Sequence, residues 1–330
     1  MAASAAGPRC RRMAASVGRC GMAERHKWRI LQPSTRAFWR EGRRTRGYSL
    51  LDFAHGYVYG RWPYHYLGAR RIPLLARPVL LLGGLLLMRR HGKKPEEGHH
   101  PLADSYHGKV LPLDAATRLV TLNLPLDVRN LEQVIPYPVA RDIVLQNPDH
   151  IVALECPCRA GREEPCLPVD VCLIVGEPFA SFVAEHNPAT TRWISQEEAV
   201  GILQAEHERG HVHHAFFKDA MLGRFYAICN CCSCCCGAMR AFARGIPMLA
   251  SSGYVSRVTA EACAGCGVCV GSCPFRALEM GEKAVRIDEA RCMGCGVCPS
   301  KCPRGVLSLV RDPKKGEPLD VRELAGSRVA

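Results

Sequence analysis

The chain has 330 residues, with 44 lysines and arginines against 31 acidic residues, and it contains 20 cysteines. This length leaves room for two domains and a sizeable core. Only Cys10 and Cys20 precede residue 156, and no apolar run near the N-terminus resembles a secretory signal. Concentrated cysteines in motif spacing favour metal–sulfur chemistry in a reducing cytoplasm and exclude a secreted disulfide scaffold.

The basic charge lies in the N-terminal third. Residues 1–109 form a basic, aromatic-rich segment, whereas acidic and basic residues nearly balance in the rest of the chain. The first 30 residues have no acidic residue before Glu24, which is the composition of a mitochondrial-type transit peptide. The alternative, which we favour, is a start codon placed too early, with Met13 or Met22 as the true beginning.

Residues 57–94 combine tyrosines and tryptophan with a short apolar stretch, 72–88, between basic residues. Its longest apolar run, 78–88, is far short of the ~20 residues that a spanning helix needs. One interpretation is a segment that lies on an anionic membrane surface, peripheral on the inner face. The other, slightly favoured, is a helix that docks on this protein or on a partner subunit. No nucleic-acid recognition motif accompanies the basic charge, so we expect no nucleic-acid partner.

Residues 110–250 form a Cys-rich domain that we expect to be mainly helical. Prolines interrupt its first part, and 139–145 is typical of a helix ending before Asn147-Pro148. Residues 151–154 predict a buried strand that delivers the first cysteines. Ser195 followed by Glu198 is typical of a capped helix start, and this helix should end near Gly210.

Ten cysteines of this domain are candidate ligands of a third centre. Adjacent thiolates repel one another unless a cation neutralises them. Ligand softness favours a further iron–sulfur cluster, with zinc or reactive thiols as alternatives, and the spacing leaves the ligand subset open. His211 and His213 are candidate ligands, proton relays or structural residues, and Arg159 lowers nearby thiol pKa values or caps a helix. The candidate cysteines are Cys156, Cys158, Cys166, Cys172, Cys229, Cys231, Cys232, Cys234, Cys235 and Cys236.

Two cysteine runs follow, and each has the C-x2-C-x2-C-x3-C-P spacing of bacterial ferredoxins. Three cysteines at intervals of three allow one tight loop to place three thiolates on one cubane. The fourth cysteine of each run then ligates the other cluster. Zinc would not explain two such runs. We therefore predict two [4Fe–4S] clusters, the first held by Cys263, Cys266, Cys269 and Cys302 and the second by Cys292, Cys295, Cys298 and Cys273.

A shift of 29 residues superimposes the two runs, which indicates an internal repeat. Alternating apolar residues predict strands at 254–258, 284–287 and 306–310, and 275–280 is long enough for a helical turn. Residues 251–311 thus resemble the two-cluster bacterial ferredoxin domain, a pseudo-twofold βαβ repeat. The predicted fold class is α+β, with this domain appended to the Cys-rich domain and followed by a polar tail, 312–330.

Residues 110–311 also resemble a family of prokaryotic 4Fe–4S-binding proteins in which several motifs precede such a ferredoxin domain. The motifs are CPCR at 156–159, RWISQEEA at 192–199, GHVH at 210–213 and CNCCSCCC at 229–236. His211 departs from the family, which more often has an apolar residue there. The resemblance implies iron–sulfur binding and electron transfer, without a known substrate.

These features predict an electron-transfer protein that relays single electrons between redox partner proteins. The first alternative is an oxidoreductase, or a subunit of one, whose reaction centre is the CNCCSCCC and CPCR constellation. The second is a redox-sensing binding module. Neither a nucleotide-binding loop nor a nucleophile elbow is visible in the sequence.

Overall fold

The computed structural model describes residues 32–68, 100–139 and 141–326, and the described residues from Pro33 onward form one compact unit. Most of the segment 57–94 therefore lies outside the described residues. Cys10, Cys20 and the two candidate start methionines also lie outside them.

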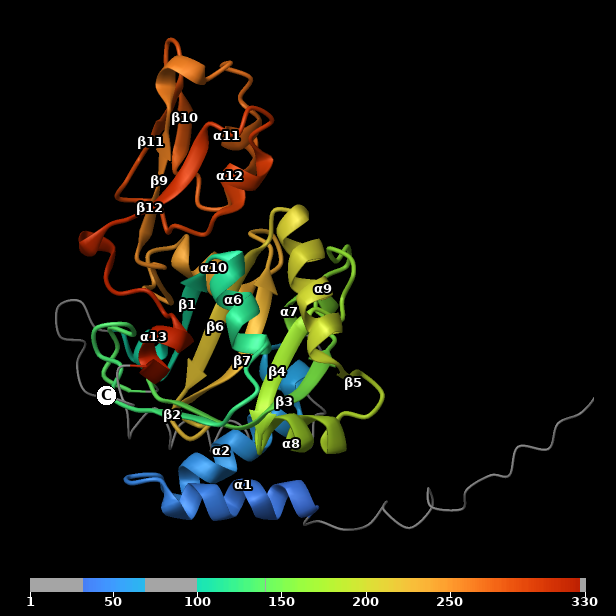
Figure 1. The fold of residues 1–330 in the computed structure, drawn as a ribbon. Coiled ribbons are helices and arrows are strands. Elements are labelled where there is room, and N and C mark those ends of the chain that lie inside the picture. The colour runs from blue at the N-terminus through green and yellow to red at the C-terminus, as the bar shows by residue number, and fades with distance from the viewer. Residues whose placement is uncertain (1–31, 69–99, 140, 327–330) are drawn as a thin grey trace, which may run out of the picture. The chain divides into compact units, whose positions relative to one another are not determined.

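An eight-stranded sheet organises the described part of the Cys-rich domain (Figure 1). Its main path runs β2-β3-β4-β7-β6-β1-β8, and β5 pairs with β3. Its strands pair antiparallel, except that β1 pairs parallel with β8. The strands are β1 (Tyr106–Leu111), β2 (Leu126–Val128), β3 (Ile143–Leu154), β4 (Cys172–Glu177), β5 (Thr191–Ile194), β6 (Val212–Lys218), β7 (Arg224–Cys231) and β8 (Leu249–Ala250).

The prediction of a mainly helical domain is therefore wrong. Helices cover both faces of the sheet, so its central strands do not alternate between apolar and polar residues; every residue of β6 is buried. The expected helix at 139–145 is also wrong, because Ile143–Leu145 pair with β2. Asn147-Pro148 breaks no helix: it lies where the register of β3 against β4 shifts, and Asn147 has φ of 47°.

Two sets of helices cover the sheet. On one face lie α8 (Phe179–His186) and the N-terminal helices α1 (Pro33–Arg44), α2 (Leu50–Arg61) and α3 (Pro63–Tyr66). Phe38 of α1 contacts the rings of Phe179 and Phe182 edge-on. The other face carries α6 (Leu113–Val120) and α9 (Gln196–Glu208). Short helices α5 (Pro101–Ser105), α7 (Pro157–Ala160) and α10 (Gly237–Phe242) lie in connections.

The local signals around α9 are confirmed. The Ser195 hydroxyl accepts a hydrogen bond from the Glu198 amide, and the helix ends at Glu208, two residues before Gly210. The buried strand expected at 151–154 is the last part of β3. These features depend on neighbours in the sequence, which is why the pattern alone predicts them.

The cysteine runs lie in two strand–helix–strand segments. They are β9 (Tyr254–Val258), α11 (Val268–Ser272) and β10 (Leu278–Met280), then β11 (Val285–Ile287), α12 (Val297–Lys301) and β12 (Leu307–Arg311). The three expected strands are confirmed, whereas the helical turn expected at 275–280 is wrong. The helices lie earlier, before Pro274 and Pro303, and β10 occupies 278–280. A pseudo-twofold relation between the segments stays a prediction.

The segment expected to be a polar tail packs against the Cys-rich domain. Leu319 and Val321 are buried in the main core, and Val321 begins α13 (Val321–Gly326). Arg118 of α6 forms an ion pair with Asp320. The described residues 312–324 therefore add to the core of the preceding domain.

Candidate metal centres and an enclosed cavity

The eight cysteines of the two runs surround two small cavities. Cys263, Cys266, Cys269 and Cys302 line one of them, and Cys273, Cys292, Cys295 and Cys298 line the other. Each cavity thus combines three cysteines of one run with the last cysteine of the other. This is the grouping that crossed ligation requires, and the ligand assignment itself stays a prediction.

Backbone conformation shapes both loops around these cavities. Gly265 and Gly267 have φ of 63° and 71°, and their counterparts Gly294 and Gly296 have φ of 64° and 83°. Such values are costly for residues with a Cβ atom. Backbone amides point at sulfur, since Ala277 N lies 3.3 Å from Cys273 Sγ. Four thiols around an enclosed space, with amide donors nearby, fit a 4Fe–4S cluster.

The two loops differ in their surroundings. The loop that contains Cys295, together with Met293 and Val297, belongs to the main core of the Cys-rich domain. Helix α12 contacts α9, and the Lys301 ammonium donates to the Glu208 carbonyl. The loop at Cys263–Cys273 has no residue in that core, and Cys266 is exposed. One cysteine set therefore adjoins the upstream domain, and the other lies nearer solvent.

The ten upstream cysteines divide into two groups, and the first is a quartet. The Sγ atoms of Cys166, Cys232, Cys234 and Cys235 all lie within 4.8 Å of one another. Among the described residues, no other His, Cys, Asp or Glu group of three or more is this tight. A tetrahedral ion with bonds of about 2.3 Å separates its thiolates by roughly 3.8 Å. The Cys166–Cys234 and Cys234–Cys235 sulfur distances, 3.2 and 3.7 Å, fit a single ion.

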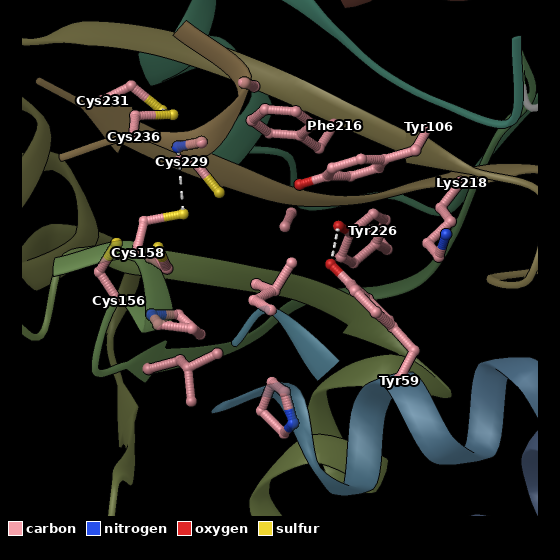
Figure 2. A pocket seen from close by; sticks show the side chains of 18 of the residues that line it. Tyr59, Tyr106, Cys156, Cys158, Phe216, Lys218, Tyr226, Cys229, Cys231 and Cys236 are labelled. Carbon is pink, nitrogen blue, oxygen red and sulfur yellow. Dashed lines mark hydrogen bonds between the residues drawn. The ribbon is translucent and has the colours of Figure 1, made fainter. Parts of the chain in front are cut away.

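The other six cysteines, together with Cys232 of the quartet, line a larger cavity of about 250 Å³. Figure 2 labels five of the six at one end of it. The six come from the start of α7, the start of β4, the end of β7 and the start of α10. Cys172 and Cys229 face each other across the β4–β7 pair, and the Cys231 and Cys236 sulfurs are 3.1 Å apart. We call this set the six-cysteine group: Cys156, Cys158, Cys172, Cys229, Cys231 and Cys236.

One motif serves two groups because the strand ends inside it, and Cys232–Cys236 lie in the following turn. Cys229 and Cys231 lie on the same face at the end of β7, whereas Cys232 belongs to the quartet. The sequence predicted one centre of unknown subset. No local pattern in CNCCSCCC separated two groups or showed that Cys166 completes the quartet.

Hydrogen bonds concentrate negative charge on two thiols of the six-cysteine group. Hydrogen bonds from the Cys156 and Cys236 thiols lower the pKa of Cys158 to about 3. The Gly237 amide donates a further hydrogen bond that lowers it in the same direction. A hydrogen bond from Cys236 lowers the pKa of Cys231 to about 6, with His214 adding to the effect. The donor thiol of Cys236 has its pKa raised by the same bonds. Such charge favours a bound cation.

Arg159 and the two histidines have structural contacts. Arg159 is buried and pairs with Glu206 at 2.5 Å, and it also donates to the Asn230 carbonyl. His211 Nδ1 lies 2.7 Å from Glu206, and His213 Nδ1 lies 2.6 Å from Asn230 Oδ1. Neither histidine belongs to the quartet. These side chains anchor α7 and α9 to the end of β7.

Aromatic residues and a lysine, which the sequence did not indicate as site residues, line the rest of the larger cavity. Lys218 Nζ lies 5.1 and 5.2 Å from the ring centres of Tyr59 and Tyr106. The hydroxyls of Tyr59 and Tyr226 are 2.6 Å apart, and burial raises the pKa of both.

The tyrosines of the expected membrane segment are partly accounted for here. Tyr59 and Tyr64 are buried, so neither ring is presented to a membrane surface. In the part of the chain that the structure describes, no helix is long and apolar enough to span a bilayer. Trp62 and Tyr66 are exposed, and the apolar run with its basic flanks lies outside the described residues, so contact of this segment with a membrane or a partner stays a prediction.

Comparison with known families agrees with the geometry of the two small cavities. A family model for a 4Fe-4S dicluster domain matches residues 262–306, from just before Cys263 to just after the second run. No curated protein matches the chain. The chain therefore carries a 4Fe–4S dicluster domain, which makes it an iron–sulfur protein and supports a role in electron transfer.

Proposed function

We propose that the protein relays single electrons through two [4Fe–4S] clusters, from a redox partner toward the Cys-rich domain. The observation that carries this proposal is the division of eight cysteines between two cavities, each completed by a cysteine of the other run. When bound, the clusters supply one-electron transfer. The chain orients them through its left-handed glycines and its amide donors to sulfur.

The burial difference gives the relay a direction. Cys266 is exposed, so the cavity that it lines is the one that a redox partner can approach. Cys295 lies in the same apolar core as Cys231 and Cys236, so the second cavity is the one that we assign to the side of the six-cysteine group. The Phe242 and Phe275 rings, 6.0 Å apart, are a further contact between the two domains.

The quartet is proposed as the third centre, and it holds a single tetrahedral ion. Its sulfur distances suit zinc or iron in a four-thiolate site. Such an ion would fix the segment around Cys166 against the turn at Cys232–Cys235, and the partly exposed Cys234 would remain close to solvent. A cubane at this position would require its thiolates to move apart.

An oxidoreductase is the second candidate function. The specific observation in its favour is the cavity beside the six-cysteine group, because a pure relay needs no space for a small molecule.

The test is anaerobic purification of the full chain with iron, zinc and acid-labile sulfide analysis and EPR of the reduced protein. We expect signals of two 4Fe–4S clusters and one further ion, which Cys234→Ser should release. Ser233→Ala, a change at the exposed neighbour of Cys234, is the matched control and should retain the ion. A colourless protein without sulfide would contradict the relay, and sulfide lost on Cys234→Ser would contradict the single ion.

A further inference from the structure

The larger cavity has cysteines at one end and tyrosines with a lysine at the other. In Figure 2, the labelled cysteines lie at one end, and Tyr59, Tyr106, Tyr226 and Lys218 lie at the other. The Tyr106 ring stacks on Phe216 with ring centres 5.0 Å apart. Exposed Leu67 and Leu102 also line the cavity, so it reaches the surface. Its other lining is mostly apolar.

The six-cysteine group resembles the ferredoxin cysteines more than the quartet. Among the described residues, neither the six nor the eight ferredoxin cysteines include three sulfurs within 4.8 Å of one another. A cluster distributes its thiolates over several metal atoms, and the Cys231 and Cys236 sulfurs, 3.1 Å apart, are close enough to share one of these atoms. Hydrogen bonds link the six in series: Cys229 to Cys172, Cys172 to Cys156, Cys156 to Cys158, Cys158 to Cys236 and Cys236 to Cys231. None of the six forms a disulfide.

Buried cysteines usually serve as small hydrophobic residues that fill the core. This role does not explain why six thiols from four separate segments converge on one cavity wall. It also does not explain the empty space beside them, since interiors are normally close-packed.

The other end of the cavity suits an anion. Lys218 is buried at the end of β6, and its ammonium group lies among the rings of Tyr59, Tyr66 and Tyr106. Its ion pair with Asp219 has an N–O distance of 3.8 Å, which is longer than a hydrogen bond. Asp219 and the rings together stabilise this cation, and a ligand carboxylate in the cavity would accept hydrogen bonds from the Lys218 ammonium group. The Tyr59–Tyr226 hydroxyl pair adds donors and acceptors beside it.

We propose that this cavity is a substrate chamber in which the six-cysteine group binds a cluster of several metal atoms. A small, mostly apolar carboxylate occupies the rest of the cavity with its anionic group at Lys218. The inference rests on the proposed relay for its electron supply. The six-cysteine group is then the last electron acceptor of the relay. The tyrosines line the cavity and position the ligand beside the cysteine sulfurs.

The predicted cluster in the six-cysteine group is tested on the full chain under anaerobic conditions. Two ferredoxin clusters account for about eight sulfides, so we expect the wild type to hold more than that. Cys172→Ala with Cys229→Ala should lower iron and sulfide together and leave both ferredoxin EPR signals in place. Cys234→Ser is the control, and it should release one ion and no sulfide. Wild-type sulfide of about eight would overturn the chamber cluster even if the double variant failed to fold.

The predicted carboxylate site is tested with benzoate as the probe and uncharged benzamide as its control. We expect benzoate to alter the EPR signal of the chamber cluster and to raise the thermal midpoint, with benzamide at least tenfold weaker. Lys218→Met keeps the length of the side chain and should weaken benzoate at least tenfold while leaving iron and sulfide unchanged. Equal effects of the two probes, or of benzoate on both proteins, would overturn the carboxylate site. Loss of the ferredoxin signals would instead count against the relay itself.

Discussion

The two cysteine loops have the same spacing and unlike surroundings. Val268 and Val297 occupy equivalent positions of the 29-residue repeat, yet Val268 is 45% exposed and Val297 is fully buried. A Cβ atom at Gly265 would meet nothing closer than 3.9 Å, whereas one at Gly294 would lie 2.3 Å from the Tyr254 carbonyl oxygen. The same cysteine motif thus occurs in two environments: the first loop faces solvent, and the second is buried inside the protein.

The difference shows that the second loop packs into the hydrophobic core of the upstream domain. Met293, Cys295 and Val297 share a core with the sheet, as do Leu319 and Val321 beyond the ferredoxin segment. Removing everything after residue 251 would take these side chains from the core. Point variants of the full chain are therefore better probes than truncation, and matched positions of the repeat provide their controls.

The largest effect is expected from the cysteines that cross between the loops. Cys273→Ala should remove the cluster of Cys292, Cys295 and Cys298, with a loss of about four iron atoms, because that set then has three thiolates. Cys302→Ala should remove the other cluster instead. EPR of the reduced proteins and iron analysis distinguish the two. Loss of the cluster beside the mutated cysteine in sequence would show that ligation is not crossed.

The matched glycines sharpen the comparison. Both Gly294→Ala and Gly265→Ala force a residue with a Cβ atom into a left-handed conformation, which costs about 1 kcal/mol. Gly294→Ala also drives the new methyl group into backbone, so we expect a total near 3 kcal/mol and partial loss of the adjacent cluster. Thermal midpoints of the anaerobic proteins test this. Equal midpoints for the two variants would contradict the close approach at Gly294.

The matched valines should differ less. Val297→Ala removes two buried methyl groups and leaves a cavity between α12 and the upstream core, at a cost of about 2 kcal/mol. Val268→Ala acts at an exposed position and should change stability by no more than about 0.5 kcal/mol. Denaturant midpoints of the two variants provide the measurement. A large effect at Val268 would mean that the outer loop has a partner surface of its own.

The smallest effect concerns His213, whose neighbour in the stack is His207, next to the second loop. Burial lowers the pKa of His213 to about 4. The folded state therefore binds fewer protons than the unfolded state, so stability is full above pH 6.5 and falls as the pH drops toward 4. Between pH 7.5 and 6.0 we expect a loss of about 0.8 kcal/mol. His213→Gln should remove most of this dependence, and a similar slope in that variant would exclude His213 as its source.

Features of short range were predictable from the sequence. The ferredoxin strands and the Ser195 cap are confirmed, and the cysteine spacing predicted the dicluster domain, because each depends on residues within one or two turns of chain. Tertiary structure decided the rest. Only strand pairing shows that the Cys-rich domain is built on a sheet, because strands covered on both faces lose their alternation. Only folding brings Cys166 to the CNCCSCCC turn and Lys218 to Tyr59 of α2, across gaps that no local pattern spans. The repeat, too, defined two equal loops, and the core that buries one of them comes from residues far away in the chain.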